Sequence, residues 1–194
     1  MSRGLQLQAT QPVVTLNGVP ASVGAFASRL IDERLLAAPV ELDHVPLGES
    51  SSNMSVRQTL QPLSQLAGFE QWLGWVSDWA RLFSLYSDAS RVRMRLSHSR
   101  QPSCPKFHVD GVRLRCIAVL NGPGTEWLRA QDVRRLEDGS IAQNPDPALV
   151  QQIAPRSVAF FPGLYFDPTG NCGVVHRSPP DCVDRVVMTL DMAT

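Results

Sequence analysis

The sequence predicts an α+β protein in which a mainly helical N-terminal part, residues 1–90, packs on a C-terminal β-barrel or sandwich, residues 91–194. Up to residue 87, apolar residues recur every three or four positions, whereas over residues 91–97 they alternate with polar residues and short apolar runs follow. Gly, Pro and Asn cluster between the later apolar runs, as expected of turns between strands. A chain of 194 residues is expected to form a single domain around one core.

The N-terminal part contains a weak strand signal and two helix signals. The strand is expected at residues 12–16 and the first helix at residues 21–36. The clearest helix, at residues 68–87, carries a stripe of large apolar side chains, which is typical of a helix that faces a core. This stripe consists of Phe69, Trp72, Leu73, Val76, Trp79, Leu82, Phe83 and Tyr86.

Beyond Asp88 the apolar period changes from that of a helix to that of a strand. The segment Arg91–Ser97 places Val92, Met94 and Leu96 on one face, because successive side chains of a strand point to opposite sides. Residues 138–155 are long and rich in Pro, and we expect them to cross the barrel mouth. Further strands are predicted at residues 107–109, 113–120, 158–161, 173–176 and 185–191.

The composition excludes several classes of partner. Lys plus Arg and Asp plus Glu number 18 each, so no net charge favours binding to nucleic acid or to an anionic membrane. No apolar run approaches the length of a membrane span, and residues 1–11 lack the apolar core of a signal peptide. We therefore expect a cytoplasmic protein that acts on a small-molecule or peptide substrate, and the sequence leaves its oligomeric state open.

The most informative residues are His108 and Asp110, followed 68 residues later by His176. Residues two apart on a strand share a face, so His108 and Asp110 can reach one point together. A second histidine from a neighbouring strand would complete a facial triad of two imidazoles and one carboxylate. Such a triad leaves adjacent metal positions open and suits non-haem Fe(II) and oxygen chemistry.

Arg185 adds a second signal, because it begins the otherwise apolar strand predicted at residues 185–191. An arginine buried without a partner is costly, so this position calls for a carboxylate. A bound oxo acid would supply that carboxylate with bidentate geometry.

These four residues resemble the signature of the Fe(II)/2-oxoglutarate-dependent dioxygenases, a family built on a double-stranded β-helix, a jelly-roll or cupin-like barrel. The resemblance covers about residues 104–191 and implies that His108, Asp110 and His176 hold Fe(II). It also implies that 2-oxoglutarate chelates the iron while Arg185 binds its distal carboxylate. The implied activity is hydroxylation or oxidation of an unidentified substrate, with the three iron ligands as the catalytic centre.

The sequence departs from this resemblance at Val187. Many members of the dioxygenase family carry Ser or Thr two residues after the arginine, as a second contact to the cosubstrate. The identity of the oxo acid, and its use, therefore stay open. The segments Cys104–Asp110 and Gly122–Trp127 also resemble an uncharacterised bacterial domain family, which covers most of the chain and implies no chemistry.

A zinc site is the alternative reading of the same region. Cys104 precedes His108 by four residues, and Cys172 precedes His176 by four. Two Cys and two His ligands would form a tetrahedral structural zinc site in a protein without catalytic activity. We favour the His-Asp-His triad, because a zinc site leaves Asp110 and Arg185 unexplained. In a third reading, a metal-free cupin-like barrel, the triad residues only form hydrogen bonds.

Glu126 and Trp127 are candidates for the mouth of a substrate pocket. They follow a predicted turn at residues 122–124, and a tryptophan there can stack on a flat substrate. A tryptophan that anchors the loop to the core is an equally good interpretation.

Overall fold

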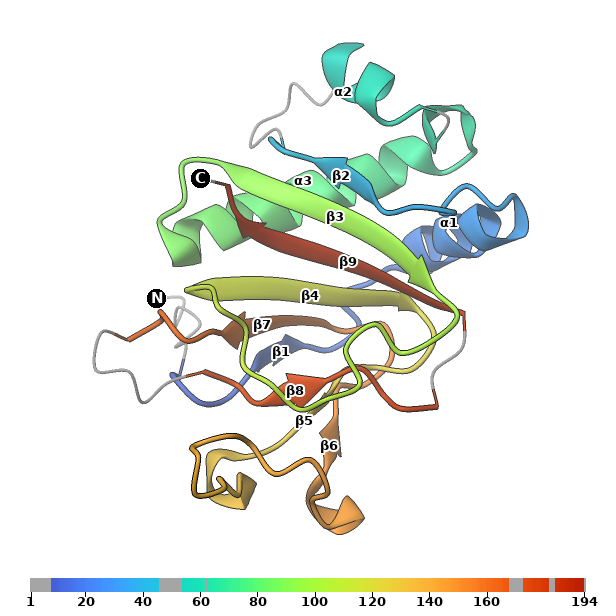
Figure 1. Cartoon of the computed structure of the whole chain (residues 1–194). Helices are drawn as coiled ribbons and strands as arrows, with labels where there is room; N and C mark the ends of the chain where they lie inside the picture. Colours follow the sequence, from blue (N-terminus) through green and yellow to red (C-terminus); the bar gives the residue numbers. More distant parts are fainter. Residues whose placement is uncertain (1–7, 46–53, 62, 168–172, 182–183, 194) are drawn as a thin grey trace.

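Two antiparallel β-sheets face each other, and helices cover the outer side of the larger sheet (Figure 1). The structure is a computed structural model that describes residues 8–45, 54–61, 63–167, 173–181 and 184–193. Within these residues, the strand order is β1-β7-β4-β9-β3-β2 in the larger sheet and β6-β5-β8 in the smaller one. The protein is thus the α+β fold that the sequence predicts.

The N-terminal part supplies both the helices and the two edge strands of the larger sheet. The helices are α1 (Ala21–Asp32), α2 (Met54–Thr59) and α3 (Phe69–Ser87), with short 3-10 turns at Leu63–Gln65, Ala130–Asp132 and Pro147–Leu149. The larger sheet comprises β1 (Val13–Thr15), β2 (Val40–Leu42), β3 (Val92–Ser99), β4 (Leu114–Asn121), β7 (Val158–Pro162) and β9 (Arg185–Met192). The smaller sheet comprises β5 (Glu126–Trp127), β6 (Gln151–Gln152) and β8 (His176–Arg177).

The main core lies between the helices and the larger sheet. Phe26 of α1 stacks on Trp72 of α3 with ring centroids 5.2 Å apart, and Phe83 of α3 stacks on Phe160 of β7 at 6.2 Å. Strand β9 turns Val186, Met188 and Leu190 into this core. Because side chains alternate along a strand, its intervening residues face the smaller sheet, and the inner space between the sheets is lined from both sides.

The predicted helix at residues 68–87 is confirmed, as α3 spans Phe69–Ser87 and ends at Asp88, which has a φ of +57°. The first helix is shorter than predicted and ends at Asp32. Arg34 has a φ of +56°, a left-handed conformation that does not continue an α-helix. Strand β2 is too short for its pattern to be recognised in the sequence, whereas β1 lies where the weak strand signal was found.

The strand predicted at residues 107–109 is reduced to a single bridge between His108 and His176, and the strand predicted at residues 173–176 is shortened to β8 (His176–Arg177). Around residue 107, a side chain takes the place of a neighbouring strand. The Gln143 side chain accepts from the Phe107 amide at 2.7 Å and donates to the Phe107 carbonyl at 3.0 Å. Gly173 has a φ of +108°, so regular strand geometry begins only at β8.

The loop that carries Asp110 is clamped against the turn that follows β7. The Leu164 amide donates to the Asp110 carbonyl at 2.9 Å, and the Gly163 amide donates to the Arg113 carbonyl at 3.0 Å. A Cβ atom at Gly163 would collide with the carbonyl oxygens of Val112 and Asp110. Glycine at this position therefore allows the two backbones to approach closely enough to fix Asp110.

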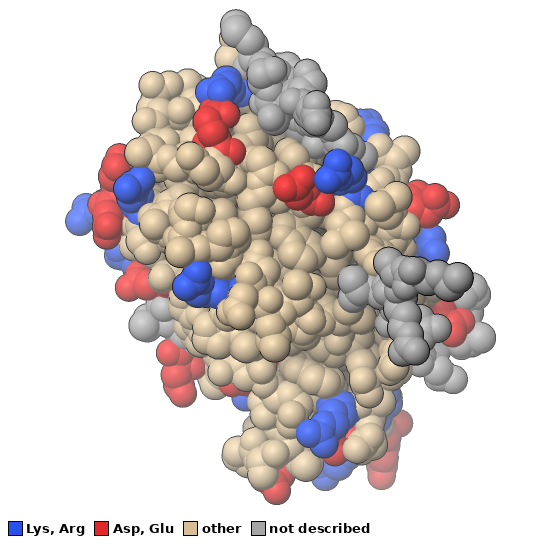
Figure 2. Space-filling model, turned by 180° about the vertical axis from the view of Figure 1, so that it is seen from behind, with Lys and Arg blue, Asp and Glu red and all other residues tan. Residues whose placement is uncertain are grey.

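The surface carries mixed charge where it can be seen. On the face shown in Figure 2, basic and acidic side chains are interspersed and apolar or uncharged residues fill the centre, in line with the net charge of zero. None of the helices in the described part of the chain combines the length and the apolar character that crossing a membrane requires.

Replacing Gly163 by alanine should destabilise the protein, since the added methyl group meets backbone rather than a side chain that can move aside. We expect a loss of about 1–3 kcal/mol, the usual cost of overpacking. Gly111→Ala is the matched control in the same loop, because a Cβ there meets nothing within 4 Å. Thermal denaturation followed by circular dichroism measures both variants, and equal melting temperatures would contradict the proposed clamp.

Candidate metal centre

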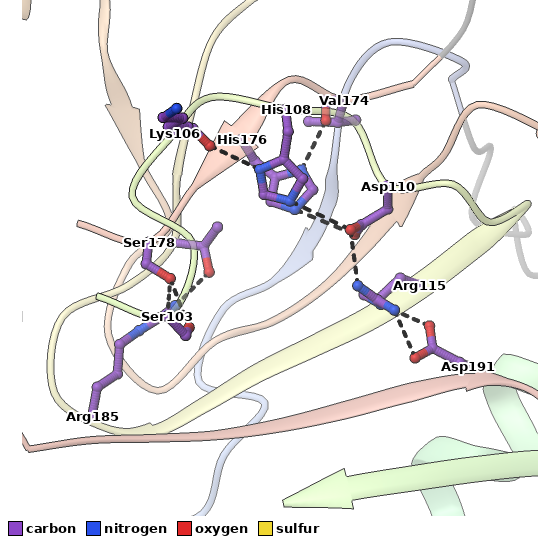
Figure 3. Close-up of polar contacts among 11 residues, drawn as sticks. Ser103, Lys106, His108, Asp110, Arg115, Val174, His176, Ser178, Arg185 and Asp191 are labelled. Atoms are coloured by element: carbon purple, nitrogen blue, oxygen red, sulfur yellow. Dashed lines mark hydrogen bonds and ion pairs between the residues drawn. The ribbon is translucent and has the colours of Figure 1, made fainter. Parts of the chain in front are cut away.

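His108, Asp110 and His176 converge on one point between the two sheets (Figure 3). His108 and Asp110 belong to the segment that precedes β4, and His176 begins β8. The backbones of the two histidines exchange hydrogen bonds, with N–O distances of 3.0 and 2.9 Å. This exchange makes the two imidazole rings neighbours, with centroids 4.6 Å apart.

The geometry of the three side chains is that of a ligand set. One ligand atom from each residue lies within 4.8 Å of the other two. His176 Nε2 lies 3.3 Å from Asp110 Oδ2, and His108 Nε2 lies 3.5 Å from Asp110 Oδ1. Asp110 and His176 are 9% and 5% exposed, whereas the His108 side chain is 35% exposed. The centre is therefore closed on the His176 side and open beside His108.

Each histidine is held in a defined tautomer by a backbone carbonyl. His108 Nδ1 donates to the Lys106 carbonyl, and His176 Nδ1 donates to the Val174 carbonyl, both at 2.9 Å. A carbonyl only accepts hydrogen bonds, so Nδ1 carries the proton and, in the neutral ring, Nε2 presents a lone pair. Metal-binding histidines are commonly oriented by such an outer contact.

Neighbouring donors and cations keep the Asp110 carboxylate in its charged form. Burial by itself raises the pKa of Asp110, but the neighbouring His108 and His176 rings and the Arg115 guanidinium outweigh burial and hold it far below its usual range. The Asp110 carboxylate in turn raises the pKa of His108 against the effect of burial. Asp110 Oδ2 is buried and has no hydrogen-bond partner. Two imidazole nitrogens and one orphaned carboxylate oxygen are a donor set that fits a divalent transition metal.

Arg115 lies directly behind the triad, whereas the sequence favours a solvated strand arginine at this position over a contact to an anionic substrate. Its Nη1 donates to Asp110 Oδ1 at 2.9 Å, and its Nε and Nη2 donate to the two carboxylate oxygens of Asp191 at 2.7 and 2.9 Å. Burial lowers the pKa of Arg115, but the two carboxylates raise it by more. The sequence contains a signal for a buried, paired arginine here, because Arg115 interrupts an apolar strand just as Arg185 begins one.

Arg185 lies in the same cavity as the triad and is 4% exposed. Its guanidinium donates to the hydroxyls of Thr125 at 2.6 Å and Ser178 at 3.2 Å, and to the Pro123 carbonyl at 3.0 Å. These contacts fix the direction of the guanidinium. The structure therefore brings together all four residues of the predicted iron and cosubstrate site.

The cavity has a volume of about 110 Å³, and both polar and apolar residues line it. Hydroxyl groups come from Ser103, Thr125, Ser178 and Thr189, and Val187 is one of its apolar members. Its size suits a small molecule. Its walls come from both sheets, so the site exists only when the sheets are packed together.

The predicted zinc ligands are placed only in part. Cys104 is an exposed free thiol that lines the cavity, but the cluster of converging ligand atoms does not include it. Cys172 lies outside the described residues, so the four-ligand arrangement stays untested. The triad needs neither thiol to be complete.

Glu126 and Trp127 lie beside the cavity and not among the residues that line it. Glu126 accepts from Arg177 Nε at 2.7 Å, and Arg177 itself reaches the cavity. Trp127 pairs with His176 between β5 and β8 and packs on the core between the sheets. Their part in a substrate pocket stays a prediction.

The stability of the metal-free protein should depend on pH through Asp110 and His108. The lowered pKa of Asp110 contributes stability above its unfolded value of about 3.9, and this contribution is lost as the pH falls. The raised pKa of His108 contributes stability below about 6.5, and this contribution is lost as the pH rises. The melting temperature of Asp110→Asn should therefore fall furthest below that of wild type between about pH 4 and 6.5. A difference independent of pH would contradict the assignment.

Solved structures of other proteins resemble this fold. The dioxygenase for auxin oxidation from rice is similar with a TM-score of 0.57 and 13% identity, over 96% of this chain and 74% of that chain. EvdO2 from Micromonospora carbonacea var. aurantiaca, solved in complex with 2-oxoglutarate, is similar with a TM-score of 0.47 and 10% identity. The similarity covers 96% of this chain and 87% of that chain. A prolyl-4-hydroxylase from Pseudomonas putida has a TM-score of 0.44 and 13% identity, over 94% of this chain and 87% of that chain. The last two scores are too low to carry an argument.

The similarity to the rice dioxygenase confirms an α+β protein built on a double-stranded β-helix. No curated protein sequence matches the chain. One family model matches residues 13–191, which is nearly the whole sequence. The chain therefore belongs to the family described as protein of unknown function (DUF1826).

Proposed function

We propose that the protein is a non-haem Fe(II) oxygenase that uses 2-oxoglutarate as its cosubstrate. The observation that carries this proposal is a buried carboxylate oxygen, Asp110 Oδ2, which has no hydrogen-bond partner and faces two histidines whose tautomer leaves Nε2 free to bind a metal. A buried arginine, Arg185, lines the same cavity. Together these groups supply three metal ligands and one cation for a carboxylate.

In this proposal His108, Asp110 and His176 hold the iron. The bound iron supplies the activation of dioxygen that is coupled to oxidation of the 2-oxo acid and of the substrate. The protein supplies position: the Lys106 and Val174 carbonyls set the two ring orientations, and Arg115 sets that of Asp110. The tilted contact between Phe161 and His176, with ring centroids 4.9 Å apart, keeps water away from the closed side.

Arg185 is the proposed partner of the distal carboxylate of 2-oxoglutarate. A planar guanidinium can bind a carboxylate through two parallel hydrogen bonds. Val187 offers no hydroxyl two residues later, but Thr125, just before β5, and Ser178, just after β8, bring hydroxyls to the guanidinium. We propose that these hydroxyls compensate for Val187.

The exposed side of the centre, beside His108, is the proposed approach for the substrate. The cavity of about 110 Å³ favours a small molecule or a single side chain of a peptide over a long segment. The second resemblance, to an uncharacterised bacterial family through residues 104–110 and 122–127, adds no substrate class.

Metal binding is tested with variants of the triad and of the nearby thiol. His176→Ala and Asp110→Ala should each remove stoichiometric Fe(II) after anaerobic reconstitution, because two ligands do not replace three. Cys104→Ser is the matched control and should retain the metal, since its thiol stands outside the cluster. Elemental analysis of the desalted protein gives the readout. Loss of metal in Cys104→Ser, with retention in Asp110→Ala, would instead establish the zinc alternative.

Cosubstrate binding is tested at Arg185. Anaerobic addition of 2-oxoglutarate to the Fe(II) protein should produce a visible absorption band, and succinate should form once oxygen is admitted. Arg185→Gln should weaken 2-oxoglutarate binding about 10- to 100-fold while Fe(II) stays bound, since a charge-assisted hydrogen bond is lost. Arg95→Gln, on the exposed face of β3, should bind normally. No absorption band in the wild-type protein would remove 2-oxoglutarate from the proposal.

A further inference from the structure

Arg115 bridges two carboxylates on different parts of the chain (Figure 3). Arg115 of β4 and Asp191 of β9 stand opposite each other in the sheet register. Two guanidinium nitrogens of Arg115 bind Asp191, and the remaining one, Nη1, binds Asp110. Since β4 and β9 are central strands of the larger sheet, this guanidinium is fixed to a rigid support.

The bridge divides the two oxygens of Asp110 between different tasks. Oδ1 accepts a hydrogen bond from Arg115 at 2.9 Å. Oδ2 is buried without a hydrogen-bond partner and lies 3.3 Å from His176 Nε2. A metal bound to Oδ2 would replace the contact with His176 Nε2 and leave the hydrogen bond from Arg115 to Oδ1 in place.

We propose that Arg115, anchored by Asp191, is a positioning residue that reserves Oδ1 of Asp110, so that the carboxylate binds the metal through Oδ2 alone. This inference rests on the proposed metal at the triad and goes beyond it by assigning Arg115 and Asp191 the task of fixing the direction of the Asp110 carboxylate. A carboxylate can bind a metal through one oxygen or through two. Single-oxygen binding keeps one more position on the metal for the oxo acid, oxygen or water.

An arginine is suited to this task and a lysine is not. The guanidinium directs three donors outward in one plane, which lets it hold Asp191 and Asp110 at the same time. A lysine keeps the positive charge but is a point donor on a flexible chain, so it does not hold both carboxylates in fixed directions. Arg115→Lys therefore separates the geometry of the bridge from its charge.

The test uses Co(II) as the probe, because its visible spectrum reports coordination number. Wild type, Arg115→Lys and Asp191→Asn are titrated with Co(II) under anaerobic conditions, and their melting temperatures are recorded without metal. We expect Co(II) affinity to fall about 10- to 100-fold in Arg115→Lys, the usual effect of losing an outer contact to a ligand. The band positions and intensities should also change, because Asp110 becomes free to bind through both oxygens.

Arg95→Lys is the matched control, since Arg95 also pairs with a carboxylate, Glu41, but lies on the exposed face of β3. It should leave the affinity and the spectrum unchanged. Asp191→Asn keeps Arg115 and should shift the spectrum in the same direction as Arg115→Lys, and it decides the question if Arg115→Lys does not fold. Wild-type affinity and spectrum in the folded variants would overturn the inference and leave the proposed metal centre intact. No Co(II) binding by the wild-type protein would overturn both.

Discussion

The candidate site depends on one contact, the reciprocal pair of backbone hydrogen bonds between His108 and His176. These residues stand 68 positions apart, and neither lies in a long strand of the larger sheet. The contact sets their imidazole rings side by side, and Asp110 follows two residues after His108 on the same side. Without the contact, the three ligands would belong to two segments that are far apart in the sequence.

The surrounding fold supports this contact from two directions. The helices bury one face of the larger sheet, so the alternate side chains of β4 and β9 must face the smaller sheet. Arg115, Arg185 and Asp191 therefore reach the inner space, where the arginines meet Asp110, Asp191 and hydroxyl groups. Burial of these charges is tolerated because each is hydrogen-bonded.

The triad differs from an ordinary buried polar cluster in how its hydrogen bonds are distributed. Each Nδ1 atom is occupied by a carbonyl, and Asp110 Oδ1 is occupied by Arg115. The atoms that remain, two Nε2 and one Oδ2, all face inward and are all suited to accept a positive charge. In the structure the Nε2 atoms of His176 and His108 lie 3.3 and 3.5 Å from the Asp110 carboxylate oxygens, and a metal bound between them would replace these contacts.

The sequence determined the elements whose signals are local. The apolar stripe of α3 and the alternation in β3 follow the side-chain periods of a helix and a strand, and β4 and β9 are short apolar runs. His108 and Asp110 share a face because they are two residues apart. Only the tertiary structure decided what depends on register and on non-local contacts. Arg115 meets Asp191 because β4 pairs with β9 in one register, and residues 107–109 lose their strand to the side chain of Gln143. Neither the register nor a side chain that replaces a strand leaves a period in the sequence, because both are set by residues dozens of positions away.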